Sequence, residues 1–222
     1  SALPSYELAR FAAEQYPAWL RGTVRGDEVL FAPDRIALWA EYFSNAHVLY
    51  AVANRVGAIA ATGWLPRGRV EVLELGGGLG SGALAFLEQL ESAGRRADLA
   101  RYRLRRAQRT LAARFPGAGW LATSRLDMNR PFEAQGVESG GATLVYAVNT
   151  LHVADDLART LAEIRRALAP GGWLVVAECV RPFPDRPVYV EFMFHLLDAF
   201  TAPPVLAPYR PRGGFLTPEQ WE

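Results

Sequence analysis

The most informative stretch of this chain is Glu74-Leu75-Gly76-Gly77-Gly78-Leu79-Gly80-Ser81-Gly82. It continues a short β-rich run that starts at Val70, and an apolar helical pattern over residues 83–90 follows it. Glycines in such a loop let the backbone approach a ligand closely, and the N–H groups at the start of the helix lack intrahelical partners and can bind that ligand. The stretch therefore predicts a strand, a ligand-binding loop and a helix in succession.

Strand-like and helical patterns alternate after this loop. Further strands are expected at residues 120–123, 143–149 and 173–177, and helices at residues 104–115 and 155–168. Alternation of this kind is typical of a parallel sheet with helices on both faces. The last strand is apolar throughout, as expected for a strand that is buried on both faces. We therefore predict an α/β fold with a mostly parallel sheet.

The beginning of the chain has helical spacing only. Apolar residues recur at intervals of three and four, as at Ile36 and Trp39. We expect an N-terminal helical lid over residues 1–66 and an α/β core over residues 67–222. The proline-rich segment 201–214 is expected to be an irregular connection, with a lid as the alternative.

The composition limits the classes of function. The chain has 222 residues, 50% of them hydrophobic and 21% charged, which suffices for one sizeable core. The formal net charge of +1 gives no sign of a nucleic-acid partner. Cys179 is the only cysteine, which excludes a disulfide framework and predicts a cytoplasmic location. No apolar run approaches the ~18 residues of a membrane-spanning helix, so no membrane partner is expected.

Two interpretations of the glycine loop compete. Gly78-x-Gly80-x-x-Ala83 matches the dinucleotide-binding pattern G-x-G-x-x-A. Glu74, however, closes the strand just before the glycines, and its carboxylate suits a ligand with an ammonium group better than a pyrophosphate. The later run Leu168-Ala169-Pro170-Gly171-Gly172, before the last strand, belongs to a different pattern.

Together, E-x-G-x-G-x-G and L-x-P-G-G resemble two motifs of the class I S-adenosylmethionine (SAM) methyltransferases. The resemblance implies a Rossmann-like fold with SAM as cofactor. It places the methionine and ribose part of SAM against four residues of the loop: Glu74, Gly76, Gly78 and Gly80. It also places the adenine at Asp127 and Met128, and the sulfonium beside Asn149.

The chain departs from this family at the end of the second strand, where an acidic residue normally binds the ribose hydroxyls. Here Tyr102-Arg103 runs directly into Leu104-Arg105-Arg106, which we expect to be helical already. A strand and a helix need a connecting turn, so we expect a short loop to be missing from the sequence near residues 103 and 104. A helix that starts after Thr217 stops at Glu222, which predicts an incomplete C-terminus.

A histidine and a carboxylate follow the last two strands. His152 comes just after the strand 143–149, and Glu178 ends the strand 173–177. Neighbouring parallel strands bring their carboxyl ends to the edge where α/β folds bind ligands. An imidazole that a carboxylate orients is suited to act as a general base.

The N-x-L-H sequence and the glutamate are similar to those of the C-methyltransferase domains of polyketide synthases, above all in loading modules that precede a GNAT-like domain. In that family a His–Glu dyad removes an α-proton from an acyl group on a carrier protein. The resemblance implies an acyl carrier protein with a malonyl or methylmalonyl group as partner, and a neighbouring GNAT-like domain. It covers residues 38–50, 74–82, 127–129, 148–153, 178–182 and 214–221.

Some enzymes of this group use one metal ion, which draws attention to a third residue, His195. Two histidines and one carboxylate suit Fe(II) with open positions, so His152, Glu178 and His195 are candidate ligands of Fe(II) or Mn(II). A lone histidine on an apolar stretch is more often a packing residue.

We therefore expect a SAM-dependent C-methyltransferase that acts on a malonyl-type group in starter-unit biosynthesis. Two alternatives stay open at this point. One is a free-standing O-methyltransferase that uses His152 as the base on a hydroxyl group. The other is an inactive SAM-fold domain, which would fit a true deletion after the second strand.

Overall fold

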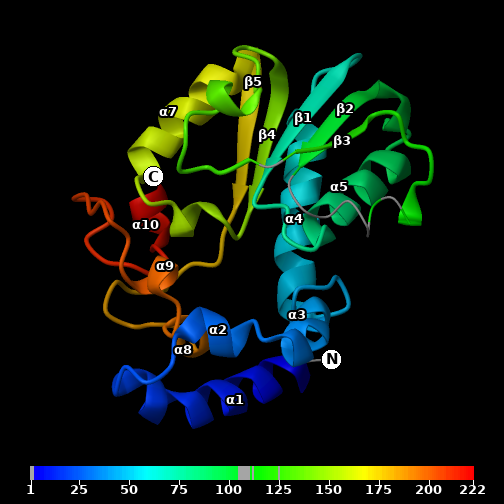
Figure 1. Cartoon of the computed structure of the whole chain (residues 1–222). Coiled ribbons are helices and arrows are strands. Elements are labelled where there is room, and N and C mark those ends of the chain that lie inside the picture. Colours follow the sequence, from blue (N-terminus) through cyan, green and yellow to red (C-terminus); the bar gives the residue numbers. More distant parts are fainter. Residues whose placement is uncertain (1–2, 105–110, 112, 125) are drawn as a thin grey trace. The chain divides into compact units, whose positions relative to one another are not determined.

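The computed structural model describes residues 3–104, 111, 113–124 and 126–222 (Figure 1). The chain forms two compact units. The first, the helical unit, consists of Ser1–Tyr50, His152–Asp156 and Cys179–Glu222. The second, the sheet unit, consists of Ala51–Leu151 and Leu157–Glu178. The boundary that we predicted at residue 66 lies within the sheet unit, because the last turns of the preceding helix pack into the core of that unit.

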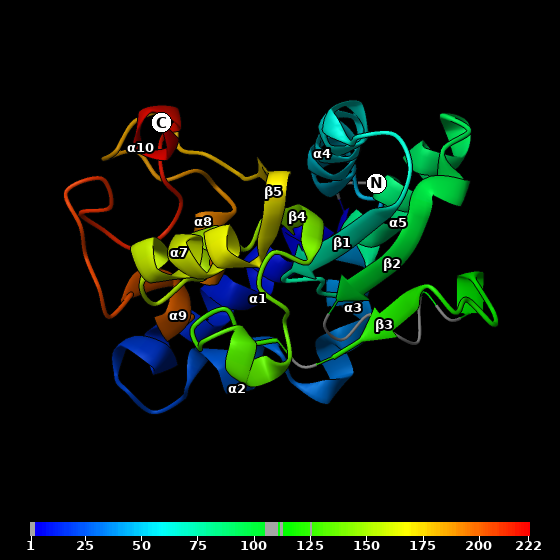
Figure 2. The ribbon, with the colours of Figure 1, turned by 90° about the horizontal axis from the view of Figure 1, so that it is seen from above.

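The sheet unit is built on five parallel strands in the order β3-β2-β1-β4-β5. The first strand, β1, lies in the middle of this sheet. The next two strands, β2 and β3, extend the sheet to one edge, and β4 and β5 then pair on the other side of β1 (Figure 2). Ligands of open α/β sheets bind at such a switch point, outside the carboxyl ends of the strands. The strands are β1 (Val70–Leu75), β2 (Leu99–Leu104), β3 (Leu121–Thr123), β4 (Ala142–Val148) and β5 (Leu168–Ala177).

Helices lie on both faces of this sheet, which confirms the predicted α/β class. On one face, α4 (Val48–Trp64) and α5 (Ser81–Ser92) share a core with the strands. Phe86 of α5 is fully buried there against the rings of Tyr102 and Tyr146. Helix α7 (Leu157–Ala167) lies on the opposite side (Figure 2).

Strand β2 is longer than we predicted. Leu104 pairs with Thr123 of β3, so the expectation that Leu104 is already helical is wrong. The strand continues because Leu104 is a buried member of the sheet core. Residues 111, 113 and 114 are helical, whereas residues 105–110 and 112 lie outside the described part of the chain. A loop missing near residues 103 and 104 stays a prediction.

Six helices of 4 to 18 residues lie within the described part of the helical unit. Its core holds Leu8, Trp39, Tyr42, Met193 and Phe200, which come from both ends of the sequence. Its helices are α1 (Leu3–Leu20), α2 (Gly26–Leu30), α3 (Ile36–Tyr42), α8 (Glu191–Phe194), α9 (Asp198–Thr201) and α10 (Pro218–Trp221), with the 3-10 turns η1 (Pro33–Arg35) and η4 (Leu151–Val153), the latter starting in the sheet unit. N-terminal helices were predicted for this part of the chain, and they are present.

The last helix begins where the sequence predicts. Thr217 is the N-cap of α10, Pro218 is its first residue, and Thr217 and Gln220 form a reciprocal capping box. None of the described helices is both long and apolar enough to cross a lipid bilayer.

Candidate functional site

The glycine loop joins β1 to α5 at the carboxyl edge of the sheet. Gly76, Gly78 and Gly80 have φ angles of +67°, +46° and +90°, a region that other residues rarely adopt. Gly80 is the N-cap of α5 and brings no side chain over the first turn of the helix. The loop therefore turns sharply and leaves the N-terminus of α5 open to a ligand, as the sequence predicts.

Two of these glycines differ in what surrounds them. A β-carbon at Gly76 would lie 2.0 Å from Oγ1 and 2.4 Å from Cβ of Thr150, the second residue after β4. A β-carbon at Gly78 would meet only the carbonyl oxygen of Gly76, at 3.5 Å. Gly76 is thus required by packing within the protein, whereas the space in front of Gly78 is open.

Glu74 at the end of β1 is a buried carboxyl group, with 3% of its surface exposed. The hydroxyl of Tyr102 donates a hydrogen bond of 3.1 Å to its Oε2. Its Oε1 lies under the first turn of α5, 3.2 Å from where Gly82 would carry a β-carbon. Burial raises the pKa of Glu74 to about 8, although the hydrogen bond from Tyr102 favours the ionised form.

This carboxyl group predicts a pH dependence of stability. Between the ordinary glutamate pKa of 4.5 and about 8, the folded state holds a proton that the unfolded state has released. The free energy of unfolding should therefore fall as the pH rises through this window, by up to about 1.4 kcal/mol for each pH unit. Glu74→Gln should remove this slope, as measured by denaturant unfolding at about pH 5 and about pH 8.

The matched control for this test is Glu71→Gln on the same strand. Glu71 lies on the other face of the sheet, where Arg69 and Arg101 pair with it at 2.8 and 3.8 Å. An unchanged slope in Glu74→Gln would show that Glu74 is ionised in the folded protein.

Asp127 and Met128 lie in the loop after β3, and the side chain of Gln135 holds this loop. Gln135 Oε1 accepts a hydrogen bond from the amide of Asp127 at 2.7 Å, and Gln135 Nε2 donates to the Asp127 carbonyl at 2.9 Å. The carboxylate of Asp127 accepts the amide of Asn129 at 3.0 Å. Thr160 of α7 donates to the Met128 carbonyl at 3.1 Å. No sequence pattern indicates Gln135, whose side chain fixes the backbone of the predicted adenine site.

Asn149 directly follows β4, and it is the one described residue other than glycine with a positive φ, at +47°. Asparagine tolerates this conformation better than most residues, and such strain is often found at functional sites. Its amide donates to the carbonyl of Ala177 at 2.8 Å, so the ends of β4 and β5 are tied together.

The Glu178 carboxylate binds the backbone of the two residues that follow Asn149. Its Oε1 accepts hydrogen bonds from the amides of Thr150 and Leu151, at 2.9 and 2.7 Å. These two residues immediately precede His152. Glu178 therefore fixes the chain that leads into His152.

His152 itself belongs to the helical unit. It is buried, and its imidazole packs edge-on against the rings of Phe215 and Phe200, with centroid distances of 4.8 and 5.7 Å. His152 and Glu178 fall in different units, so their pairing as a dyad stays a prediction.

His195 of the helical unit lines a pocket together with Tyr16, Trp19 and Arg181. Burial lowers the pKa of His195, which favours a neutral imidazole. Across the described part of the chain, no group of three or more His, Cys, Asp or Glu side chains is arranged to hold a metal ion. The predicted set of His152, Glu178 and His195 draws on both units and stays a prediction.

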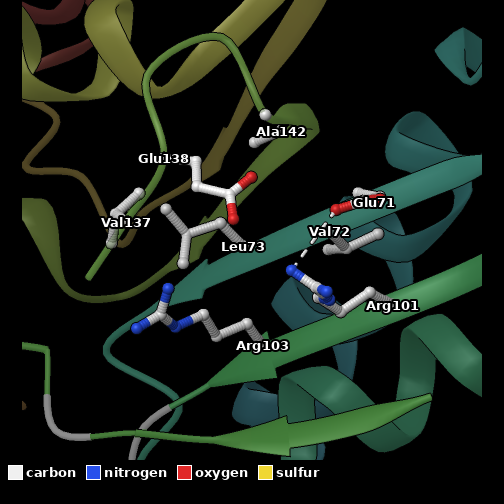
Figure 3. A pocket seen from close by; sticks show the side chains of 9 residues that line it. Glu71, Val72, Leu73, Arg101, Arg103, Val137, Glu138 and Ala142 are labelled. Atoms are coloured by element: carbon white, nitrogen blue, oxygen red, sulfur yellow. Dashed lines mark ion pairs between the residues drawn. The ribbon is translucent and has the colours of Figure 1, made fainter. Parts of the chain in front are cut away.

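A second pocket lies against β1 and β2 (Figure 3). Arg103 at the end of β2 donates to Ser124 Oγ at 2.8 Å and to the carbonyls of Gln135 and Gly136 at 3.0 and 2.5 Å. Its guanidinium thus ties β2 to two loops that follow β3, one of which supports Asp127. The pocket includes none of the predicted cofactor-binding residues; it is lined by Glu71, Val72, Leu73, Arg101, Arg103, Val137, Glu138, Gly141 and Ala142.

Known proteins share this arrangement. A family model described as a methyltransferase domain matches residues 73–174, which run from β1 to β5. The polyketide synthase ThaG of Burkholderia thailandensis is 33% identical over 192 residues, and the highly reducing polyketide synthase FUM1 of Gibberella moniliformis is 32% identical over 168 residues. The crystal structure of the CurJ carbon methyltransferase superposes with a TM-score of 0.80 at 25% identity, over 99% of this chain.

This chain is a SAM-dependent methyltransferase domain, similar to those of polyketide synthases. The α/β sheet with its helices has the Rossmann-like methyltransferase fold that the glycine loop and the L-x-P-G-G run predict. The chain spans 6% of FUM1 and 3% of ThaG, a small part of those synthases, and 57% of the CurJ carbon methyltransferase chain.

Proposed function

We propose that this methyltransferase domain methylates the α-carbon of a malonyl-type acyl group attached to an acyl carrier protein, in the biosynthesis of a polyketide starter unit. The observation that carries the proposal is the common edge of the sheet: the open glycine loop after β1, the strained Asn149 after β4 and Glu178 after β5. The likeness to polyketide synthases and to a protein described as a carbon methyltransferase supports carbon as the acceptor.

The residues at this edge fit SAM. The open space at Gly78 and the uncapped start of α5 suit a ligand that the backbone contacts directly. Glu74, Gly76, Gly78 and Gly80 would hold the methionine and ribose part, Asp127 and Met128 the adenine, and Asn149 would border the sulfonium. SAM bound at this edge would supply an electrophilic methyl group for attack by the acceptor carbon, and the thioether that remains would be the leaving group.

His152 is the proposed general base. Its imidazole accepts the α-proton of the acyl group as the C–H bond breaks, and the electron pair of that bond becomes the enolate that forms the new carbon–carbon bond. The aromatic rings of Phe200 and Phe215 pack against the imidazole, and His152 is buried. The negative charge of Glu178 would stabilise the imidazolium formed, if the dyad forms as proposed.

The decisive experiment is intact-protein mass spectrometry of a carrier protein loaded with malonyl or methylmalonyl and incubated with SAM and the domain. Addition of one or two methyl groups to the acyl chain supports the proposal. Methylation of free hydroxylated compounds, with no change in the loaded carrier protein, would support the O-methyltransferase alternative. Absence of both SAM binding and transfer would support an inactive domain. Genomic sequence next to this segment tests the proposed GNAT-like neighbour.

The metal hypothesis has its own test. If His152, Glu178 and His195 bind Fe(II) or Mn(II), the purified domain should contain about one equivalent of metal, and His195→Ala should lose it, because two ligands hold a metal poorly. Elemental analysis of both proteins measures this directly. Full transfer activity of metal-free wild-type protein would contradict the hypothesis and leave the His–Glu pair as the catalytic group.

A further inference from the structure

The proline-rich segment 201–214 is more ordered than a plain connection. Ala207 and Arg210 form an antiparallel bridge, in which the Arg210 amide donates to the Ala207 carbonyl at 2.8 Å. Pro208 takes the second position of this four-residue turn, where its fixed φ favours the turn conformation. The turn directs the side chain of Arg210 into the protein, and only 1% of its surface is exposed.

The buried guanidinium of Arg210 binds the segment that carries His152. Its Nη1 donates to the carbonyl of Ala154 at 2.6 Å, and its Nη2 donates to the carbonyl of His152. A third hydrogen bond joins the same segments, from the amide of Val205 to the carbonyl of Asp155 at 3.1 Å. All of these residues belong to the helical unit.

The chemistry of the guanidinium and of the two carbonyl groups explains why position 210 is an arginine. The short turn η4 leaves its last carbonyl groups without intrahelical donors. A guanidinium presents several N–H groups in a rigid plane and can donate to two carbonyls at once, which an ammonium group on a flexible stem does less well. Arg210 thus fixes the backbone of His152, while Phe215 and Phe200 pack against its ring.

We propose that Arg210 is a positioning residue for His152: it sets the backbone of residues 152–154 so that the imidazole meets the acyl group in the orientation that proton removal requires. This inference rests on the proposed role of His152 as the base. It assigns to the proline-rich segment the task of supporting the catalytic histidine.

The kinetic test compares Arg210→Met, which keeps the unbranched stem of the side chain but removes the guanidinium, with Arg210→Lys. Because a small misplacement of a catalytic group slows the reaction strongly, Arg210→Met should lower kcat by about ten- to a hundredfold, with the KM for the loaded carrier protein and the Kd for SAM unchanged. Arg210→Lys should recover part of kcat. Arg212→Met, an exposed arginine two residues further on, is the matched control and should retain wild-type kcat.

Chemical rescue separates positioning from a general loss of structure. In Arg210→Ala, millimolar methylguanidine should restore part of kcat, whereas the same concentration should not raise kcat of wild type or of Arg212→Met. Wild-type kcat in Arg210→Met would overturn the proposal. Equal loss of SAM affinity, thermal stability and kcat, without rescue, would also overturn it by showing a structural role only.

A second measurement does not depend on the reaction. The chain has three histidines, so the imidazole resonances of ¹⁵N-histidine-labelled protein can be assigned by substitution. Arg210→Lys should shift those of His152 and leave those of His47 unchanged; unmoved His152 resonances would contradict the proposal. If instead His152→Ala retains full transfer activity, the proposed function of His152 is wrong, whatever the spectra of the Arg210 variants show.

Discussion

His152→Ala is expected to lower methyl transfer by about a hundred- to ten-thousandfold, the range that general base catalysis supplies. The affinity for SAM should stay at the wild-type value, because His152 acts on the acceptor and the predicted SAM contacts are made by other residues. Single-turnover mass spectrometry of the loaded carrier protein gives the rate, and calorimetry gives the affinity. Wild-type turnover in this variant would remove His152 from the mechanism.

Glu178→Gln is the companion to this prediction. A glutamine oxygen can still accept the amides of Thr150 and Leu151, so the backbone before His152 should keep its position. The substitution removes only the negative charge. A large fall in kcat would therefore indicate that the charge supports the imidazolium, whereas an unchanged kcat would leave Glu178 with the purely structural role of holding the two amides.

Gly78→Val is expected to abolish measurable SAM binding while the domain stays folded. Apart from the Gly76 carbonyl at 3.5 Å, the β-carbon meets no atom, so the new side chain fills the space that the cofactor needs rather than disrupting the packing. The positive φ adds a cost of about 1–2 kcal/mol to folding. Calorimetric titration with SAM and thermal unfolding together measure the two effects.

Gly94→Val is the matched control for the backbone strain. Gly94 has a φ of +65° and no atom within 4 Å of its β-carbon position, but it lies just beyond the other end of α5. It should show the loss of stability without the loss of SAM binding. If Gly78→Val binds SAM with the affinity of Gly94→Val, the glycine loop does not form the cofactor site.

The sequence predicts the strands and the cofactor loop well because their signals are local. The glycines of the loop have the positive φ angles that their pattern requires, and Thr217 caps its helix as the run Thr217-Pro218-Glu219 predicts. Strand β2 was shortened by one residue in the prediction because its sequence alternates arginines with apolar residues. Only the pairing of Leu104 with β3 distinguishes a strand from an amphipathic helix there.

The supports of the site could not be predicted because their partners are distant in sequence or are backbone atoms. Gln135 holds the backbone of Asp127, Arg103 holds the loop beyond it, and Arg210 reaches the carbonyl of His152 across 58 positions of the sequence. Every residue has a backbone carbonyl group, so a sequence motif cannot indicate which carbonyl accepts a hydrogen bond. The one sequence signal was the placement of Arg210 directly after Pro208-Tyr209. We interpreted the whole segment 201–214 as an irregular connection, with a lid as the alternative.

The close contact between Gly76 and Thr150 restricts how this domain can diverge. A β-carbon at position 76 would overlap not only the hydroxyl of Thr150 but also its Cβ, so only glycine at position 150 would make room for it. The loops after β1 and β4 therefore cannot evolve independently, even though these two residues are 74 positions apart in the sequence. Among homologous sequences, we expect any residue other than glycine at position 76 to co-vary with position 150. Directed evolution that changes the loop after β4 would therefore have to change the glycine loop after β1 at the same time.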